Sequence, residues 1–300
     1  MTDFLYSTLA RLPITDATAA TLRDAADRMI AHDASLFARA VAQYYDNEFD
    51  AERVYDLLHP VADKLHIPEQ TANLLFIVCA AQRLQRTYAE RGYDAALFDD
   101  FLADIAAKGN ECMRRLGVFG ITTIAHWYPS FFSLKMFALG RLQYELYYRK
   151  HVTSVVTVGG HDVRPTDMVY YIHIPSVGPL TKELCMDSYR RAHRFFRQEH
   201  APDPLVFYCS SWLLYERNRE FMDPSSNILR FMSDFKITDS YADPTQKYWG
   251  IFDMPYEGDA SALPRNTSLQ RRAAAWLENG GVPGGGEGYF LFDGEQILNE

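Results

Sequence analysis

The sequence predicts an α+β protein with an all-helical first part, residues 1–135, and a second part, residues 136–300, in which strands and helices are mixed. Two observations support this division. In the first part, apolar residues recur at three- and four-residue steps, which is the spacing of amphipathic helices. In the second part, short runs of aromatic and β-branched residues lie between glycines and prolines, as is typical of strands.

Composition and charge indicate a folded protein and exclude some classes of function. Of the 300 residues, 48% are hydrophobic and 14% are aromatic, which is enough to build a substantial core. The net charge of −9 is spread evenly and no segment is a basic arm, so we expect no binding to nucleic acid. The four cysteines stand singly in apolar sequence, which predicts buried, reduced thiols and no metal site.

The start of the chain and its longest apolar run both bear on localisation. Residues 1–5 lack a basic segment followed by a long apolar one, so no signal peptide is expected. The apolar run at 74–81 is far shorter than the roughly 20 residues needed to span a bilayer. We therefore expect a cytoplasmic protein that does not bind membranes.

The helical part is expected to contain several amphipathic segments. Thr15 or Asp16 can cap the first of them. The apolar run at 74–78 continues nearly all round its helix, which predicts a buried helix. Three histidines of this part share no metal-ligand spacing and are predicted to be structural: His32, His59 and His66. The segments after the first are 36–49, 51–58, 69–91 and 93–116.

The second part is expected to hold six strands. In the first, 142–148, the alternation places Glu145 on the face opposite Leu142 and Tyr144. Gly159 and Gly160 predict a hairpin after the second. The glycine-rich segment 280–288 is interpreted as a flexible connection. The other strands are expected at 153–158, 169–175, 204–214, 247–252 and 289–292, and helices at 182–196, 218–222, 227–235 and 269–277, the last capped by Thr267 or Ser268.

The most informative stretch runs from Val169 to Phe196. A buried strand ends at Pro175, a turn containing Gly178 follows, and a helix begins near Lys182. Such a turn leaves backbone N–H groups unpaired at the positive end of a helix dipole, where an anion such as pyrophosphate can dock. An ordinary strand–helix connection accounts for the same residues, because a lone glycine turn is a weak motif.

The order of the expected elements and several phrases resemble a known family. The phrases are Leu139-Gly140-Arg141-Leu142-Gln143-Tyr144-Glu145-Leu146, Ile172-His173-Ile174-Pro175 with Gly178-Pro179-Leu180, Cys209-Ser210-Ser211-Trp212-Leu213-Leu214, and Ser226-Asn227-Ile228. They resemble a bacterial two-domain family of acyltransferases with an N-terminal helical domain and a C-terminal domain similar to GCN5-related N-acyltransferases (GNATs). The resemblance covers nearly the whole chain. It implies domains at 1–135 and 136–300, the second a GNAT-like mixed β-sheet flanked by helices.

The resemblance implies transfer of an acetyl or other acyl group from acyl-CoA to an amine by direct attack. Acetyl-CoA or another acyl-CoA would be the co-substrate, a small molecule or a peptide would be the acceptor, and a homodimer stays open. Leu180 stands where the general GNAT motif has a second glycine, and Pro179 removes one amide donor. The residues that would bind the cofactor are Ile174, Ser176, Val177, Gly178, Leu180, Thr181, Ser211 and Asn227.

Three residues are candidates for proton transfer. If the strands pair as in a GNAT, His173 and Glu145 could face the cleft between two central strands, and either could be the general base. Tyr215 could protonate the leaving thiolate. Each has a structural alternative, since a histidine between isoleucines is often a core residue and Tyr215 could be a surface aromatic. Asn227 could simply cap its helix, and Ser211 could satisfy local backbone.

Three other functions remain open at this level. The second domain could be a degenerate GNAT that binds a ligand or regulates a partner without catalysis, which the missing second glycine favours. A hydrolase could use Ser210 or Ser211 as its nucleophile. The acyl acceptor could carry an oxygen nucleophile in place of an amine.

Overall fold

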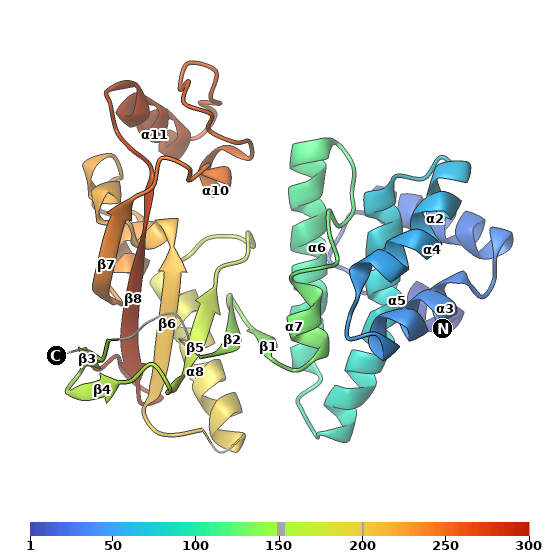
Figure 1. The fold of residues 1–300 in the computed structure, drawn as a ribbon, viewed down its shortest axis with the longest axis horizontal. Helices are drawn as coiled ribbons and strands as arrows, with labels where there is room; N and C mark the ends of the chain where they lie inside the picture. Colours follow the sequence, from blue (N-terminus) through green and yellow to red (C-terminus); the bar gives the residue numbers. More distant parts are fainter. Residues whose placement is uncertain (149–153, 200, 300) are drawn as a thin grey trace. The chain divides into compact units, whose positions relative to one another are not determined.

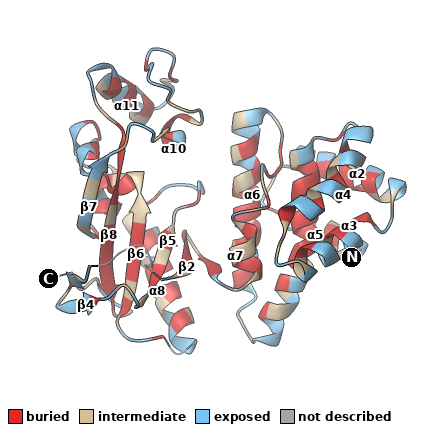
Figure 2. Cartoon of the chain, in the orientation of Figure 1, coloured by how far each residue is buried: buried red, intermediate tan, exposed pale blue. Residues whose placement is uncertain are grey.

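The computed structural model describes residues 1–148, 154–199 and 201–299 and divides into two compact units, Met1–Ala138 and Leu139–Glu300 (Figure 1). Each unit has its own buried interior (Figure 2). The first is helical and the second contains a mixed sheet with helices, so the predicted α+β class is confirmed.

All residues of the first unit are described, and seven helices form most of it. Helix α5 is central, because α1 to α4, α6 and α7 all contact it. Every residue from Thr71 to Ala81 of α5 is buried, as the apolar run predicts. No helix in the described part of the chain is both long and apolar enough to cross a membrane. The helices are α1 (Thr2–Leu9), α2 (Asp16–His32), α3 (Leu36–Asp46), α4 (Ala51–Lys64), α5 (Glu69–Glu90), α6 (Ala96–Leu116) and α7 (Tyr128–Phe132).

Buried polar contacts attach the segment after α6 to this bundle. The Asn73 side-chain amide donates to the carbonyl of Ile121 at 3.1 Å, and its oxygen lies 3.0 Å from Nε2 of His59. The Tyr44 hydroxyl donates to the carbonyl of Ile124 at 2.9 Å. Because these groups are buried or half-buried, satisfying their hydrogen bonds fixes the path of the segment that leads to α7. His59 thus makes a structural contact.

The chain forms a six-stranded sheet of order β1-β2-β5-β6-β8-β7, in which β2, β5, β6, β7 and β8 belong to the second unit (Figure 1). The pair β5–β6 is parallel, whereas β2–β5, β6–β8 and β7–β8 are antiparallel. A separate hairpin joins two short strands through Gly159 and Gly160, whose φ angles of 50° and 72° suit the predicted turn. The strands are β1 (Met136–Leu139), β2 (Leu142–Tyr148), β3 (Val156–Val158), β4 (His161–Val163), β5 (Met168–His173), β6 (Leu205–Ser211), β7 (Lys236–Ala242) and β8 (Gly284–Phe292). Thr153, the expected start of the second strand, lies outside the described residues.

Different elements cover the two faces of this sheet. Helix α8 (Lys182–Gln198) covers one face, where Tyr189 and Phe196 contact the rings of Tyr144, Phe207 and Phe290. On the other face, valines of the β3–β4 hairpin form a cluster with residues of β5, β6 and β8. Strand alternation therefore gives β2 and β5 one apolar face under α8 and a second face whose far end carries polar side chains.

The structure corrects several predicted elements after β6. Residues 247–252 are not a strand, because Tyr248 and Asp253 have φ angles of 51° and 54° and enclose the short helix α10 (Trp249–Phe252). The missed strand β7 is an edge strand with mostly exposed side chains, so it lacks an apolar face. The predicted strand 204–214 ends at Ser211 and continues as the 3₁₀ turn η1 (Trp212–Leu214), and η2 (Glu216–Glu220) replaces the helix at 218–222. Helix α9 spans Asn227–Met232 and is shorter than the predicted 227–235. The sequence does not predict α1 or β1.

Helix α11 (Ser268–Glu278) begins as predicted. Thr267 is its N-cap and accepts a hydrogen bond from the backbone N–H of Gln270 at 3.1 Å. The Gln270 side chain bonds back to the N–H of Thr267, which completes a capping box.

The prediction of a flexible glycine-rich loop is wrong for 284–288, which begin β8. A Cβ atom on Gly286 would lie 2.3 Å from the carbonyl oxygen of Leu214, and one on Gly284 would lie 2.3 Å from that of Tyr241. Glycine is required here because neighbouring backbones approach β8 too closely for any side chain.

The four cysteines are free and buried, as predicted. Burial raises the pKa of the Cys79 thiol to about 12 and the pKa of the Cys185 thiol to about 12. These thiols therefore stay neutral near pH 7 and are poor nucleophiles.

We expect Gly286→Ala to lower the free energy of unfolding by about 1–3 kcal/mol, because the new methyl group collides with backbone that cannot move easily. Gly285→Ala is the matched control, since the three atoms nearest to its Cβ belong to the flexible Tyr241 side chain, with the hydroxyl at 3.1 Å. Urea unfolding of both variants measures the difference. Equal losses would show that close backbone packing is not the reason for these glycines.

Candidate functional site

The pairing of β2 with β5 brings His173 and Glu145 together. Glu145 lies opposite Tyr171 in the antiparallel register, so His173 is its diagonal neighbour on the same face. His173 Nε2 lies 2.9 Å from Glu145 Oε2, and the two side chains are 17% and 25% exposed. With Nε2–H donating to the carboxylate, the basic nitrogen of the neutral ring is Nδ1, and the carboxylate stabilises the ring when it is protonated.

A tyrosine lies next to this pair. The Tyr171 ring lies 4.4 Å from the His173 ring, measured between centroids, and the Tyr171 hydroxyl donates to the carbonyl of Ser210 at 3.1 Å. Burial above all, with smaller contributions from neighbours that include Glu145, raises the pKa of Tyr171. The phenol therefore stays protonated and acts here as a hydrogen-bond donor.

The parallel ladder between β5 and β6 ends just before the pair. The register joins Tyr170 to Phe207 and Tyr171 to Tyr208. Beyond these pairs, β6 continues to Ser211 in register with β8. His173 therefore lies past the last registered pair of the two central strands, where β5 turns toward α8.

The turn between β5 and α8 is open. Ser176, Gly178 and Pro179 are exposed, and a Cβ on Gly178 would meet nothing within 4 Å. Gly178 has a φ of 65°, a conformation that disfavours other residues. Thr181 caps α8, with Oγ1 accepting from the N–H of Leu184 at 3.4 Å. Side chains thus leave this corner accessible.

Arg141, which no sequence pattern singles out, donates to three carbonyl groups of the same turn. Its Nη1 donates to the carbonyl of Pro175 at 2.9 Å, its Nε to that of Pro179 at 3.0 Å and its Nη2 to that of Gly178 at 3.3 Å. These contacts join residues 34 to 38 positions apart, so no local pattern could have indicated them.

A buried acid holds the first residue of α8. Lys182 forms an ion pair with Asp234, which is 4% exposed and lies between α9 and β7. The Tyr189 hydroxyl donates to the second oxygen of Asp234 at 3.1 Å. Burial raises the pKa of Asp234 although Lys182 and Tyr189 oppose that shift. The start of α8 is therefore tied to a residue 52 positions further along the chain.

The other predicted site residues have local contacts. Ser211 Oγ accepts from the N–H of Leu213 at 3.2 Å. Ser226 caps α9, so the interpretation of Asn227 as the cap is wrong, and Asn227 is the first helical residue. Tyr215 is only 2% exposed and its ring packs against Gly284, so it is not a surface aromatic. Ile174 and Val177 are half-buried and Leu180 is buried.

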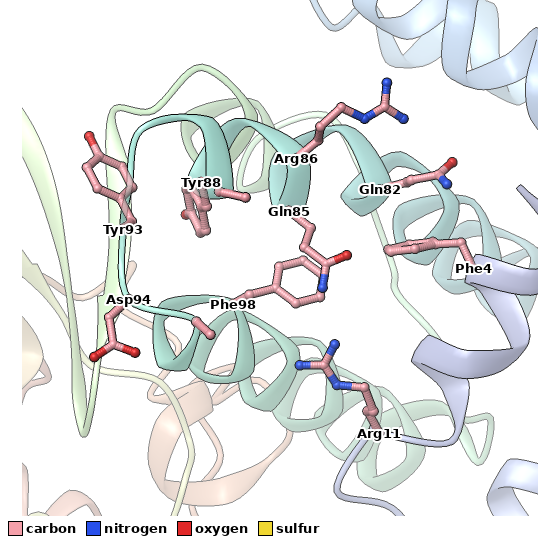
Figure 3. Close-up of a pocket in the computed structure, with 11 residues that line it drawn as sticks. Phe4, Arg11, Gln82, Gln85, Arg86, Tyr88, Tyr93, Asp94 and Phe98 are labelled. Carbon is pink, nitrogen blue, oxygen red and sulfur yellow. The ribbon is translucent and has the colours of Figure 1, made fainter.

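A pocket of about 410 Å³ lies in the helical unit between α1, α5 and α6 (Figure 3). Aromatic rings form much of its wall, and Gln85 points into the opening whereas Arg86 points away. Only residues of the first unit line it, so it includes none of the predicted site residues. Across 1–148, 154–199 and 201–299, no group of three or more His, Cys, Asp or Glu residues could hold a metal ion.

The mixed sheet with its parallel central pair, and the open turn that leads from β5 into α8, define a GNAT-like acyltransferase fold. Residues 136–290 match the family of GNAT-like C-terminal domains, and residues 3–134 match the N-acyltransferase N-terminal domain. The chain therefore belongs to this two-domain acyltransferase family, which confirms the resemblance found in the sequence.

Solved acyltransferases share the fold. A mutant acyltransferase in complex with octanoyl-CoA is 22% identical, with a TM-score of 0.69 over 94% of this chain and 85% of that chain. An acyltransferase in complex with decanoyl-CoA and teicoplanin is 21% identical, with a TM-score of 0.68 over 95% and 86% of the two chains. No curated protein matches this sequence significantly.

We expect Asp234→Asn to remove a pH dependence of stability. Burial holds the pKa of Asp234 above its ordinary 3.8, so the folded protein binds this proton more tightly than the unfolded chain. The resulting stability is full below the unfolded pKa and is lost as the pH rises through the folded pKa. Urea unfolding from about pH 3 to 7 should show wild type losing stability relative to Asp234→Asn as the pH rises. A relative gain over that range would mean that Lys182 outweighs burial.

Proposed function

We propose that this protein transfers an acyl group from acyl-CoA to an amine, with His173 as general base and Glu145 as its partner. The observation that carries the proposal is the 2.9 Å contact between these side chains, placed where β5 and β6 leave their register and next to the open turn before α8. Membership of the acyltransferase family supports it. Complexes of the solved acyltransferases with octanoyl-CoA, decanoyl-CoA and CoA support acyl-CoA as co-substrate.

The chemistry requires the acceptor ammonium to lose a proton before it attacks. His173 Nδ1 takes that proton, and Glu145 stabilises the imidazolium through Nε2–H. The amine nitrogen then bonds to the thioester carbonyl carbon, and the backbone N–H of Ile174 stabilises the oxyanion. When the intermediate collapses, the C–S bond breaks, and the CoA thiolate takes the second proton lost by the amine. No covalent enzyme intermediate forms.

The turn at 174–181 is the proposed site for the CoA pyrophosphate, because it is open and precedes a helix N-terminus. Ser211 keeps its hydroxyl proton for a pantetheine amide, since its oxygen is the acceptor of the Leu213 bond. Asn227 is half-buried and could serve the same arm. Burial of Tyr215 makes it a poor source of the thiolate proton, which the attacking amine supplies directly.

The neighbours guide the choice of acyl chain and acceptor. They were solved with octanoyl and decanoyl thioesters, so we extend the expected donors from acetyl-CoA to these longer chains. Two of these structures also contain teicoplanin or 10C-teicoplanin, which supports a small-molecule acceptor.

A second candidate is a protein that binds a ligand without catalysis. Hydrogen bonds to its own backbone N–H and to Thr181 lower the pKa of Glu183, so a carboxylate already lies at the start of α8. This carboxylate would repel a phosphate unless its exposed side chain moves aside. Isothermal titration with CoA, acetyl-CoA and octanoyl-CoA separates the candidates in part, because an acyltransferase must bind at least one thioester below millimolar concentration. If none binds, the enzyme proposal fails.

We expect His173→Ala to lower kcat by about 10²- to 10⁴-fold, because the acceptor loses its base. Glu145→Gln should cause a smaller loss, since glutamine still accepts the Nε2–H bond but carries no charge to stabilise the imidazolium. Thiol release from octanoyl-CoA with a panel of primary amines measures both.

His161→Ala on the exposed strand β4 is the control and should match wild type. Octanoyl-CoA affinity should stay within about twofold in all three variants, since the base acts on the acceptor. Tight thioester binding without turnover in wild type, over the whole amine panel, would favour the binding protein.

A further inference from the structure

The three hydrogen bonds of Arg141 determine which way the peptide groups of the β5–α8 turn face. In a trans peptide the C=O and the following N–H point in opposite directions. Among the described residues only Asp203–Pro204 is cis, so the peptides of the turn are trans. The carbonyls of Pro175 and Pro179 both point at the Arg141 guanidinium. The N–H groups of Ser176 and Leu180, which belong to the same peptides, therefore point away from it.

The third contact explains why a proline is tolerated in this turn. The carbonyl of Gly178 also accepts from Arg141, and its peptide ends in the nitrogen of Pro179, which has no hydrogen. Pro179 therefore contributes no N–H donor to the turn. The outward-facing N–H groups are those of Ser176, before Pro179, and Leu180, after it. Ser176 is exposed and a Cβ on Gly178 would meet nothing within 4 Å, so a ligand can approach the turn from solvent.

Arg141 also supplies positive charge to the turn. Its three bonds go to neutral carbonyls, and within the described residues no carboxylate forms an ion pair with it. Lys182, another cation at this corner, is paired with Asp234, and Arg230 lies near the carboxylate of Glu183. Compared with Lys182, Arg141 is therefore the less compensated cation beside the proposed pyrophosphate position.

We infer that Arg141 is a positioning residue for the nucleotide end of the CoA thioester. By holding the carbonyls of Pro175, Gly178 and Pro179, it turns the N–H groups of Ser176 and Leu180 toward the diphosphate and keeps them there before the ligand arrives. The inference rests on the proposed function. In the general GNAT motif a second glycine stands in this turn; here the side chain of Arg141, just before β2, would hold the turn in place instead.

The test compares two thioester donors in Arg141→Gln. Octanoyl-CoA carries the diphosphate, whereas octanoyl-pantetheine carries the same thioester without it. We expect kcat/KM for octanoyl-CoA to fall at least about tenfold, mostly through KM, because ordered donors and one charge are lost. The value for octanoyl-pantetheine should stay within about twofold of wild type. CoA affinity by titration should fall in parallel with kcat/KM for octanoyl-CoA.

Arg141→Lys is a second variant that is less disruptive to folding. It keeps the charge but cannot bind three carbonyls, so kcat/KM for octanoyl-CoA should fall less than in Arg141→Gln. Arg190→Gln, on the exposed side of α8, should behave as wild type. An equal loss for both donors would overturn the inference and indicate a general structural role, and so would unchanged CoA binding in both Arg141 variants. If wild type itself binds no CoA, the proposed function fails first, and the inference with it.

Discussion

The short parallel ladder between β5 and β6 is the constraint on which the candidate site depends. Two registered pairs join the strands, and the ladder stops at Tyr171 and Tyr208. Backbone groups beyond that point need other partners, because buried N–H and C=O groups are rarely left unpaired. The Tyr171 hydroxyl supplies one by donating to the Ser210 carbonyl. The ends of the two strands can therefore differ in direction while the Ser210 carbonyl keeps a hydrogen-bond partner.

Two separate anchors hold the turn that follows. Arg141 binds its carbonyls from the β2 side, and Asp234 holds Lys182 at the start of α8. The Asn299 side chain donates to the carbonyl of Asp234 at 2.8 Å, so the C-terminal segment supports the same corner. The geometry of a few exposed residues is thus set by groups far away in the chain, which reduces the cost of ordering them on binding.

The sequence predicted the elements that carry a clear periodicity. The span 142–148 matches β2 at both ends, and the run around Lys182 gives α8. The sequence-based predictions are wrong where tertiary contacts override the local preference of the residues. The glycines from 284 look flexible in isolation, but close contact with Leu214 and Tyr241 makes them strand residues.

The candidate site shows the same limit. Glu145 and His173 were chosen as base candidates from residue type and strand alternation, and the β2–β5 register brings them into contact. Arg141 has no signal in its local sequence, since its role arises from a contact across more than 30 residues. The burial of Tyr215 likewise depends on β8, which pairs with β6 from the far end of the chain.

The diagonal arrangement of Glu145 and His173 has a consequence for assembly of the sheet. Side chains alternate along a strand, so a shift of β5 by one residue against β2 would move the imidazole to the side covered by α8. There it would meet the apolar rings around Tyr189 and Phe196, and Glu145 would lose its partner. Only chains that have closed the sheet in the native register can bring Glu145 and His173 into contact, so the proposed proton-transfer pair and the correct strand pairing form together.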